Sequence, residues 1–309
     1  MYDCHYDLLT YIYMNRNDLS EVKTHCKAIF SNGIQGGIFN LFYMSPEEMK
    51  NELDINIDEL NIIDNLKDVN SVIKQEHIIP YNVRYVVGIE GLDYLNTLDD
   101  VDILYELGVR SVNPVWNNHN KFGTGIRPIK KMNEKNGLTT LGKELIHKLI
   151  ETGIAIDLSH SDEETFWDII NECKKYKNLN PKVFASHSNC KAIHNVPRNL
   201  TDEQIKAIVE FDGKIGIVSI KSFCGTEKYE QDYVEHIKHV KELLGSVNNI
   251  VLATDDMTYY KIEPEIYQNL NVFKHAEADN KITKLLEKNK FTDEEIEKIK
   301  TKNFLEMVK

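Results

Sequence analysis

Eight short apolar runs alternate with helical segments along this chain, and the alternation limits the folds open to it. The runs are rich in β-branched residues, which is typical of buried parallel strands. They are residues 2–7, 34–43, 83–89, 109–116, 154–159, 182–186, 213–220 and 249–254. Helical spacing of apolar residues predicts helices at 18–30, 46–74, 92–107, 140–152, 162–176, 201–211, 229–245, 276–289 and 293–308. Strands that recur with helices between them run parallel.

Eight parallel strands can close into a barrel with a ring of helices outside. We therefore predict an α/β fold, a (β/α)8 TIM-type barrel, with a doubly wound open sheet as the alternative. The 309 residues fit a single barrel domain, residues 1–309, that ends in C-terminal helices. Local signals agree with these boundaries. Thr201 and Thr292 begin predicted helices as capping residues, and Gly108 and Gly153 stand where helices should end.

Composition argues against several classes of protein. The net charge is -12, with no cluster of Lys and Arg, which argues against a nucleic-acid partner. The N-terminal residues have neither the cationic start nor the apolar stretch of a signal peptide, and the last segment is a charged helix, so we expect a cytoplasmic protein without a membrane anchor. Five scattered cysteines without a C-x-x-C pair predict reduced thiols. Among them Cys4, next to His5, is interpreted as a small buried apolar residue.

Metal-ligand side chains stand at the ends of the predicted strands, where barrel enzymes gather their functional groups. They are His5 and Asp7 after the first strand, Glu90 after the third, His160 after the fifth, His187 after the sixth and Asp255 after the eighth. Residues i and i+2 of a strand point the same way, so His5 and Asp7 can bind one ion while Tyr6 faces the other side.

A second ion is predicted between His160 and His187, which come from neighbouring strands, and Glu90 can reach both ions through its two oxygens. Imidazole and carboxylate without thiolate suit zinc, although manganese or cobalt would also fit. Two ions that share a water lower its pKa and supply a bridging hydroxide, while one ion polarises the carbonyl under attack. The residues therefore predict a hydrolytic site with two divalent ions, most simply Zn²⁺.

Each of these residues also has a purely structural interpretation. His160 and His187 could be hydrogen-bonded core histidines, and Asp7 and Glu90 could cap the helices that follow them. The other histidines are interpreted without a metal. The pair His236 and His239 is expected on a solvated helix face, His25, His77 and His147 at the surface, and His119, His194 and His275 in loops or helices near substrate.

Several motifs resemble those of the membrane (renal) dipeptidase family. They are D-C-H-Y-D at 3–7, G-I-E-G at 88–91, L-G-V-R at 107–110, G-L-T-T-L-G at 137–142, I-D-L-S-H at 156–160, A-S-H-S-N at 185–189 and P-R-N-L-T-D-E-Q-I at 197–205. The similarity runs nearly from end to end, and the block from 137 to 205 is the most specific part.

The chain resembles a soluble, bacterial-type member of that family. The resemblance implies a TIM-type barrel of the metal-dependent hydrolase kind, a zinc-dependent dipeptidase that often tolerates a D-residue on the C-terminal side. Its ligand positions match His5, Asp7, Glu90, His160 and His187. Arg198 matches the arginine that holds the substrate carboxylate, although the residues alone would equally allow a surface pair with Asp202. Asp255 matches the acidic residue at the end of the last strand that handles the proton, and Glu90, which bridges the two zinc ions, is counted with it as catalytic. A dipeptide is thus the expected partner, and a homodimer is left open.

Two positions depart from the family pattern. Trp116 stands where many relatives have a histidine that contacts substrate, and Asp255-Asp256-Met257-Thr258 replaces D-F-D-G. Two alternatives to the dipeptidase therefore remain. One is another barrel amidohydrolase, a deaminase or a lactonase, although these commonly open with His-x-His. The other is a non-catalytic, metal-stabilised binding protein, which would have no need of a proton shuttle at Asp255.

Overall fold

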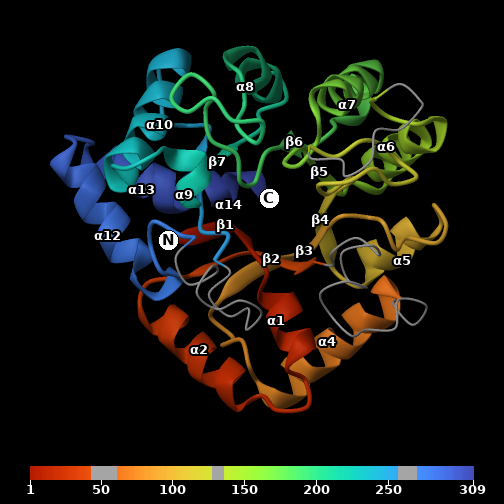
Figure 1. Cartoon of the computed structure of the whole chain (residues 1–309). Coiled ribbons are helices and arrows are strands. Elements are labelled where there is room, and N and C mark those ends of the chain that lie inside the picture. The colour runs from red at the N-terminus through yellow and green to blue at the C-terminus, as the bar shows by residue number, and fades with distance from the viewer. Residues whose placement is uncertain (43–60, 127–135, 257–269) are drawn as a thin grey trace.

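The eight predicted strands are all present and lie together in the middle of the molecule (Figure 1). The computed structural model describes residues 1–42, 61–126, 136–256 and 270–309. The strands are β1 (Tyr2–Tyr6), β2 (Gly36–Phe42), β3 (Arg84–Glu90), β4 (Val109–Asn113), β5 (Ala155–Asp157), β6 (Val183–Phe184), β7 (Ile215–Val218) and β8 (Ile250–Ala253). Every pairing is parallel, in the order β1-β2-β3-β4-β5-β6 and β7-β8. Parallel neighbours in sequence order are the mark of a barrel.

Two junctions close the barrel. Ala185, just after β6, forms a parallel bridge with Ile215 of β7. On the other side the backbone N–H of Asp255 donates to the carbonyl of His5 at 3.0 Å, which joins the end of β8 to β1. The sheet therefore returns on itself, so the predicted barrel is confirmed and the open sheet is wrong.

The closing junction at β1 is held by a buried carboxylate. Asp3 accepts hydrogen bonds from the backbone N–H and the hydroxyl of Thr254, so one side chain ties β8 to β1. Its Oδ1 also accepts the N–H of His5 at 3.2 Å. A fully buried carboxylate is stable only when its oxygens are satisfied in this way.

Helices surround the strands, and nearly all the predicted ones are present. They are α1 (Leu8–Met14), α2 (Ser20–Ser31), α4 (Ile62–Glu76), α5 (Asp100–Glu106), α6 (Thr140–Thr152), α7 (Glu163–Lys175), η2 (Lys177–Leu179), α8 (Asp202–Val209), α9 (Lys221–Cys224), α10 (Tyr229–Leu244), α12 (His275–Lys288), α13 (Asp293–Glu297), the π-helical η3 (Lys298–Lys302) and α14 (Asn303–Met307). The capping boxes at Thr201 and Thr292 are confirmed, and Gly153 ends α6 in the left-handed conformation.

Some helix boundaries differ from the prediction. The helix expected from residue 92 begins only at Asp100, because the Asp100 carboxylate accepts the N–H groups of Asn96 and Thr97 in a turn. The short helices α1 and α9 were not predicted, and the prediction for 46–60 lies outside the described residues. Within the described ranges, no helix combines the length and apolar character needed to cross a membrane.

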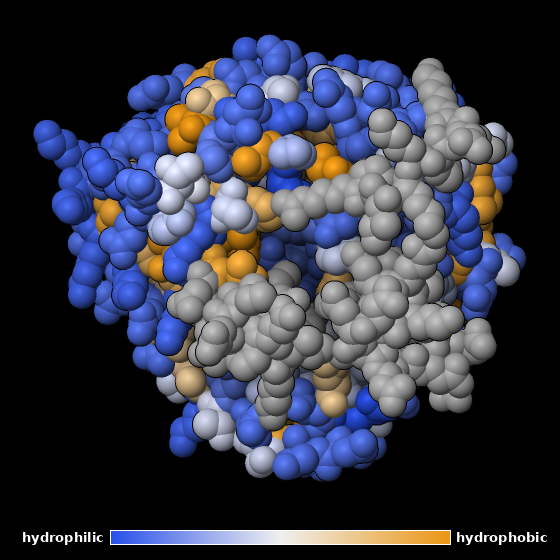
Figure 2. Space-filling model, in the orientation of Figure 1, coloured by the Kyte–Doolittle hydropathy of each residue, from blue (hydrophilic) through white to orange (hydrophobic). Residues whose placement is uncertain are grey.

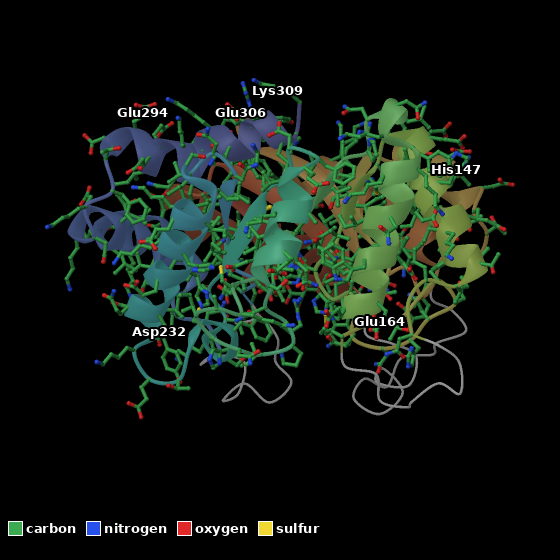
Figure 3. The ribbon with its side chains drawn as sticks, turned by 90° about the horizontal axis from the view of Figure 1, so that it is seen from above. His147, Glu164, Asp232, Glu294, Glu306 and Lys309 are labelled. Atoms are coloured by element: carbon green, nitrogen blue, oxygen red, sulfur yellow. The ribbon has the colours of Figure 1, made fainter. Side chains whose placement is uncertain are left out.

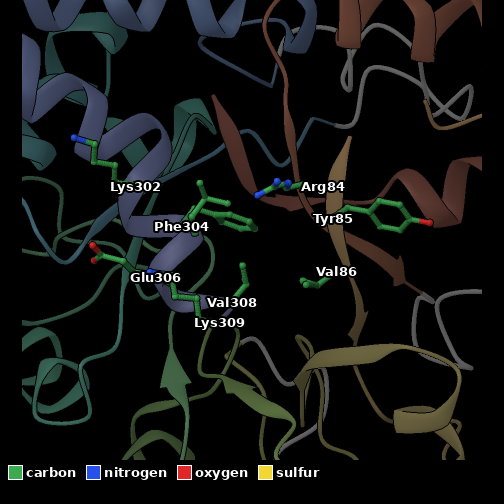
Figure 4. A pocket seen from close by; sticks show the side chains of 9 residues that line it. Arg84, Tyr85, Val86, Lys302, Phe304, Glu306, Val308 and Lys309 are labelled. Carbon is green, nitrogen blue, oxygen red and sulfur yellow. The ribbon is translucent and has the colours of Figure 1, made fainter. Parts of the chain in front are cut away.

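The two ends of the barrel differ in the residues and hollows found there. Figure 3 shows Glu164 and Asp232, near the starts of α7 and α10, toward one end, and Glu306 and Lys309 at the opposite end. A hollow of about 430 Å³ lies at the latter end, lined by Arg84 of β3 together with Phe304 and Val308 (Figure 4). Since Arg84 begins β3 and Glu90 ends it, this hollow is separate from the predicted ligands. Figure 2 shows the other face, where a hollow with hydrophilic residues lies near the middle.

Candidate metal centre

The predicted ligands come together at the carboxyl ends of the strands. His5 and Glu90 are the fourth residue of β1 and the last residue of β3, and His187 follows β6; all three are buried. One ligand atom from each lies within 4.8 Å of the others. A second group of three, His5, Asp7 and Asp255, meets the same condition. His5 belongs to both groups, so they are adjacent.

Glu90 lies between the imidazoles. Its Oε1 is 2.9 Å from Nε2 of His160 and 3.4 Å from Nε2 of His187, whereas its Oε2 is 3.3 Å from Nε2 of His5. Asp7 Oδ1 lies 3.6 Å from the same nitrogen of His5. Each oxygen of Glu90 therefore faces a different set of ligands, which is the arrangement that the sequence predicts for a bridging carboxylate.

Ser186 determines which nitrogen of the His187 imidazole carries the proton. Its hydroxyl donates to the buried carboxylate of Asp157, so its only proton is used. Nδ1 of His5 lies 3.1 Å from the Ser186 oxygen, and Nδ1 of His187 lies 2.6 Å from it. A contact between either Nδ1 and this oxygen can form only if the nitrogen donates. For His187 this leaves Nε2 with a lone pair directed at Glu90. Nδ1 of His5 also lies 3.1 Å from the amide nitrogen of Asn40, which is itself a donor, so Ser186 alone does not fix the tautomer of His5.

A hydrogen bond also orients the imidazole of His160. Nδ1 of His160 is 2.9 Å from the amide oxygen of Asn117, which can only accept, so Nε2 again keeps its lone pair. That nitrogen lies 2.9 Å from Nε2 of His187 and 3.0 Å from a guanidinium nitrogen of Arg198. Two lone pairs at this distance repel each other unless a cation lies between or beside them.

The donor set therefore fits divalent cations. Three imidazole nitrogens and the carboxylates of Asp7, Glu90 and Asp255 are all buried, and Nε2 of His5 has no hydrogen-bond partner among the described residues. Buried anions are stable only when they are paired or coordinate a metal. Imidazole and carboxylate without thiolate is the set expected for zinc.

Two residues of the cluster have strained backbone. His160 and Asp255 have φ angles of 73° and 48°, in the left-handed region that residues other than glycine rarely occupy. Both follow strands, β5 and β8, and both turn a side chain into the site. Such strain persists where the surrounding structure demands it, and it gathers at functional sites.

Burial and neighbouring charges shift the pKa values of the acidic residues. Burial raises the pKa of Asp255 to about 7, and the carboxylates of Glu90 and Asp7 add to this while His5 opposes it. Burial likewise raises the pKa of Asp7 to about 6. Burial also disfavours the anionic form of Glu90, but the imidazoles of His5 and His160 outweigh it and hold the pKa of Glu90 well below its usual value. Glu90 is thus the carboxylate held most firmly as an anion.

A pocket of about 420 Å³ adjoins this cluster. His160 and Arg198 form one wall, and Ser161, Lys191 and Gln204 are among the other residues that line it. Arg198 is only 4% exposed, and its guanidinium lies over the ring of Phe223 at 5.1 Å. A buried guanidinium at the edge of a pocket is suited to bind a carboxylate there.

Comparison with known proteins decides the family. Membrane dipeptidase, peptidase family M19, matches the chain over residues 1–309. The chain belongs to the membrane dipeptidase family. The resemblance inferred from the motifs is thus confirmed, and with it the class of metal-dependent hydrolases.

Individual relatives match over part of their length. A protein of Acinetobacter calcoaceticus described as "Uncharacterized protein in PQQ-III 3'region" is 36% identical over 135 residues, 43% of this chain and 41% of that protein. One of Klebsiella pneumoniae, "Uncharacterized protein in pqqA 5'region", is 32% identical over 181 residues, 56% of this chain and 64% of that protein. The dipeptidase aclJ of Aspergillus oryzae is 26% identical over 171 residues, 54% of this chain and 39% of that protein. The chain thus spans about half the length of these relatives.

Solved structures share the fold. The M19 metallopeptidase described as dipeptidase AC has a TM-score of 0.76 at 20% identity, covering 99% of this chain and 97% of that one. A metallopeptidase of Rhodobacter sphaeroides bound to a phosphinate mimic of the dipeptide L-Ala-D-Ala has a TM-score of 0.74 at 19% identity, with the same coverage. At these identities the likeness establishes the barrel fold of the family.

The structure corrects several interpretations that were made from the sequence of this membrane dipeptidase family member. His236 is fully buried instead of solvated, since α10 packs that face against the barrel. Asp202 contacts His239 at 2.7 Å, so the alternative pair of Asp202 with Arg198 is wrong. His275 is buried with Nε2 2.9 Å from Asp3. Its side chain therefore lies in the core and is not placed near substrate.

The structure also shows where Cys4 and Trp116 lie. Cys4 is fully buried with its pKa raised well above the usual value by burial, in keeping with an apolar role. Trp116 follows β4 and is half-buried, with its ring 5.7 Å from His160 and 4.9 Å from Phe42. The indole therefore lies beside a predicted ligand, where it can form part of the substrate site.

Ser186, Asp157 and Asn117 were missed by sequence reasoning. Two of them stand inside motifs that the sequence displays, I-D-L-S-H and A-S-H-S-N, in the positions next to or near the ligand histidines. A hydroxyl directly before a predicted ligand histidine was the available signal, because metal-binding histidines almost always donate their other N–H to a partner.

Proposed function

We propose that this protein is a binuclear zinc dipeptidase that hydrolyses the peptide bond of dipeptides, including L-D dipeptides. One observation carries the proposal: three Nε2 atoms converge on the two oxygens of Glu90, with His5 on one oxygen and His160 and His187 on the other. A single tetrahedral site needs fewer ligands than the five residues gathered here. Membership of the M19 family and the barrel fold support the same function.

The residues divide naturally between two ions. His5 and Asp7 would hold the first, His160 and His187 the second, and Glu90 would bridge them. When bound, two such ions supply a water of lowered pKa and a Lewis acid for the scissile carbonyl. The chain's own part is to fix the imidazole tautomers through Ser186 and Asn117.

Substrate binding is assigned to Arg198 and Trp116. The guanidinium offers two parallel N–H groups to the free carboxylate of a dipeptide, a geometry that Lys does not have. Trp116 stands beside His160 and would form an apolar wall for the substrate's side chains. A dipeptide is the substrate class that presents a carboxylate so close to its scissile bond.

Proton transfer is assigned to Asp255. Its carboxylate shares a cluster with ligand atoms of His5 and Asp7, within 4.8 Å, so it is near any water held there. It would accept the proton of the attacking water and pass it to the nitrogen of the leaving amine. This transfer lets the amine leave as a neutral group.

Tolerance of a D-residue is supported by one neighbour. The Rhodobacter sphaeroides structure of the same fold holds a phosphinate mimic of L-Ala-D-Ala. We propose that this chain likewise accepts a dipeptide with a C-terminal D-residue. We also propose that the chain works as one barrel domain in the cytoplasm, in keeping with its five free, buried cysteines.

The test combines metal analysis with a substrate panel. The purified protein, saturated with zinc and then freed of excess, should contain two ions per chain and should hydrolyse L-L and L-D dipeptides. Chelation should abolish the activity, and zinc should restore it. Glu90→Gln should lose metal and activity together, whereas Glu144→Gln, at an exposed residue of α6, should change neither. One ion per chain in the folded, active protein would contradict the binuclear site.

A further inference from the structure

Arg198 is carried by a loop that is closed at its base. We call residues 189–200, between β6 and α8, the arginine loop. The N–H of Leu200 donates to the carbonyl of Asn189 at 2.8 Å, and the N–H of Lys191 donates to the carbonyl of Leu200 at 2.7 Å. Because its two ends are bonded to each other, the loop can move as a unit. The position of Arg198 therefore depends on what holds the loop to the barrel.

The far side of the arginine loop is attached to the short helix α9. The amide of Asn199 donates to the carbonyl of Phe223 at 2.8 Å, and the guanidinium of Arg198 lies 5.1 Å from the centre of the Phe223 ring. Phe223 thus contacts Arg198 and its neighbour at once. Helix α9 has only four residues, so its own hydrogen bonds hold it weakly.

His236 of α10 connects the loop to this helix. Its Nδ1 accepts the backbone N–H of Cys190 at 3.1 Å, and its Nε2 lies 2.9 Å from the carbonyl oxygen of Cys224, the last residue of α9. A backbone N–H can only donate and a carbonyl can only accept. Both bonds therefore form only with the neutral imidazole that carries its proton on Nε2.

We propose that His236 is a positioning residue for substrate binding. By bridging Cys190 and Cys224, it fixes the arginine loop against α9 and so directs Arg198 at the carboxylate of a bound dipeptide. The role rests on the proposed function, in which Arg198 binds that carboxylate. Among the described residues, the His236 ring forms its hydrogen bonds with Cys190 and Cys224, which are not among the predicted metal ligands.

Two substitutions separate the halves of the bridge. The oxygen of Asn reaches the position of Nδ1, so His236→Asn can keep the bond to Cys190 and loses the one to Cys224. The amide nitrogen of Gln reaches the position of Nε2, so His236→Gln can keep the bond to Cys224 and loses the one to Cys190. His239→Gln is the matched control, one turn further along α10 and paired with Asp202.

The kinetic experiment compares each dipeptide with its C-terminally amidated analogue. Both His236 variants should raise KM for the dipeptide by roughly 10- to 100-fold, the cost of misplacing a binding group by about 1 Å, with little change in kcat or zinc content. The preference for acid over amide should shrink in parallel. Combined with Arg198→Lys, a His236 substitution should add almost nothing, because both act on the same contact. His239→Gln should match the wild type throughout.

Hydrogen exchange of residues 189–200 tests the bridge without substrate. Backbone amides there should exchange faster in both His236 variants than in wild type and in His239→Gln. Unchanged exchange, or faster exchange with an unaltered acid preference, would overturn the inference. A wild type that shows no acid preference would instead contradict the assigned role of Arg198, and the exchange rates would still decide whether His236 holds the loop.

Discussion

The hydroxyl of Ser186 donates to the carboxylate of Asp157, and this hydrogen bond fixes the tautomer of the His187 imidazole, which faces Glu90. Asp157 ends β5 and its Oδ1 also accepts the N–H groups of Ser159 and Ser186, each at 3.0 Å. The same pattern recurs at the closing junction, where Asp3 accepts the N–H and hydroxyl of Thr254. Buried aspartates thus set both the strand register and the direction of the ligands.

Ser186→Ala should weaken zinc binding. Without the hydroxyl, Nδ1 of His187 loses its acceptor, and the ring is no longer held in the tautomer that presents Nε2. Loss of such a partner typically lowers metal affinity by about 10- to 100-fold. Competition with a chromophoric chelator measures the affinity, and Ser188→Ala, a buried hydroxyl that contacts Ser159 instead, is the control. Equal affinities of the two variants would contradict the role of Ser186.

Arg198→Lys should weaken binding of dipeptides more than it slows turnover. A lysine keeps the charge and loses the two-pronged contact, so KM should rise and the preference over C-terminally amidated analogues should fall by about 2 kcal/mol. Lys191→Gln removes a cation that lines the same pocket and should leave that preference in place. If discrimination between acid and amide survives in Arg198→Lys, another group holds the carboxylate.

Asp255→Asn should separate metal binding from catalysis. The amide keeps the shape of the side chain but cannot accept a proton, so turnover should fall by about 10²- to 10⁴-fold. Zinc content should stay at the wild-type value, because the five predicted ligands remain. Single-turnover kinetics and metal analysis of the same preparation are the measurements. Loss of one ion together with activity would show that Asp255 is a ligand instead.

Trp116→His should broaden the range of substrates. If the indole beside His160 forms an apolar wall, the wild type should prefer dipeptides with hydrophobic side chains. The imidazole is smaller and polar, so small or polar dipeptides should gain in kcat/KM relative to hydrophobic ones, with activity retained. Trp167→His, on α7, is the matched control for loss of an indole. A wild type without apolar preference would contradict this role.

The strands and the ligand cluster could be predicted from the sequence because both depend on local pattern. His160 and His187 directly follow apolar runs, and in a parallel barrel the ends of all strands meet at one mouth. The alternation of strands and helices was therefore enough to predict that His160 and His187 lie close together. Whether they bind metal stays a prediction for the experiments above.

Features that depend on packing between distant segments could not be predicted. His236 stands in a helix with many charged residues, and its burial follows from the contact of α10 with the arginine loop and α9. The role of Ser186 in fixing the tautomer of His187 requires Asp157 of the neighbouring strand to lie against it. No spacing within the sequence encodes these distances.

His236 should make folding stability depend on pH below neutrality. Burial lowers the pKa of His236 to about 4, and the nearby His194 and His239 lower it further, whereas the carbonyls of Cys224 and Phe223 oppose the shift. The unfolded chain binds this proton near the ordinary value of about 6.5. Stability from the neutral ring is therefore fully present above that pH and is lost as the pH falls toward 4.

The loss should be on the order of 3 kcal/mol by pH 4, because each unit of pKa shift corresponds to about 1.4 kcal/mol. Urea unfolding at pH 7.5 and at pH 4.5 measures it. The wild type should lose more stability between these values than His236→Gln, which has no ring to protonate. Taking the difference between the two proteins removes the titration of the metal centre, which they share. His239→Gln should follow the wild type, and parallel losses in His236→Gln and wild type would show that His236 is not held neutral in the folded protein.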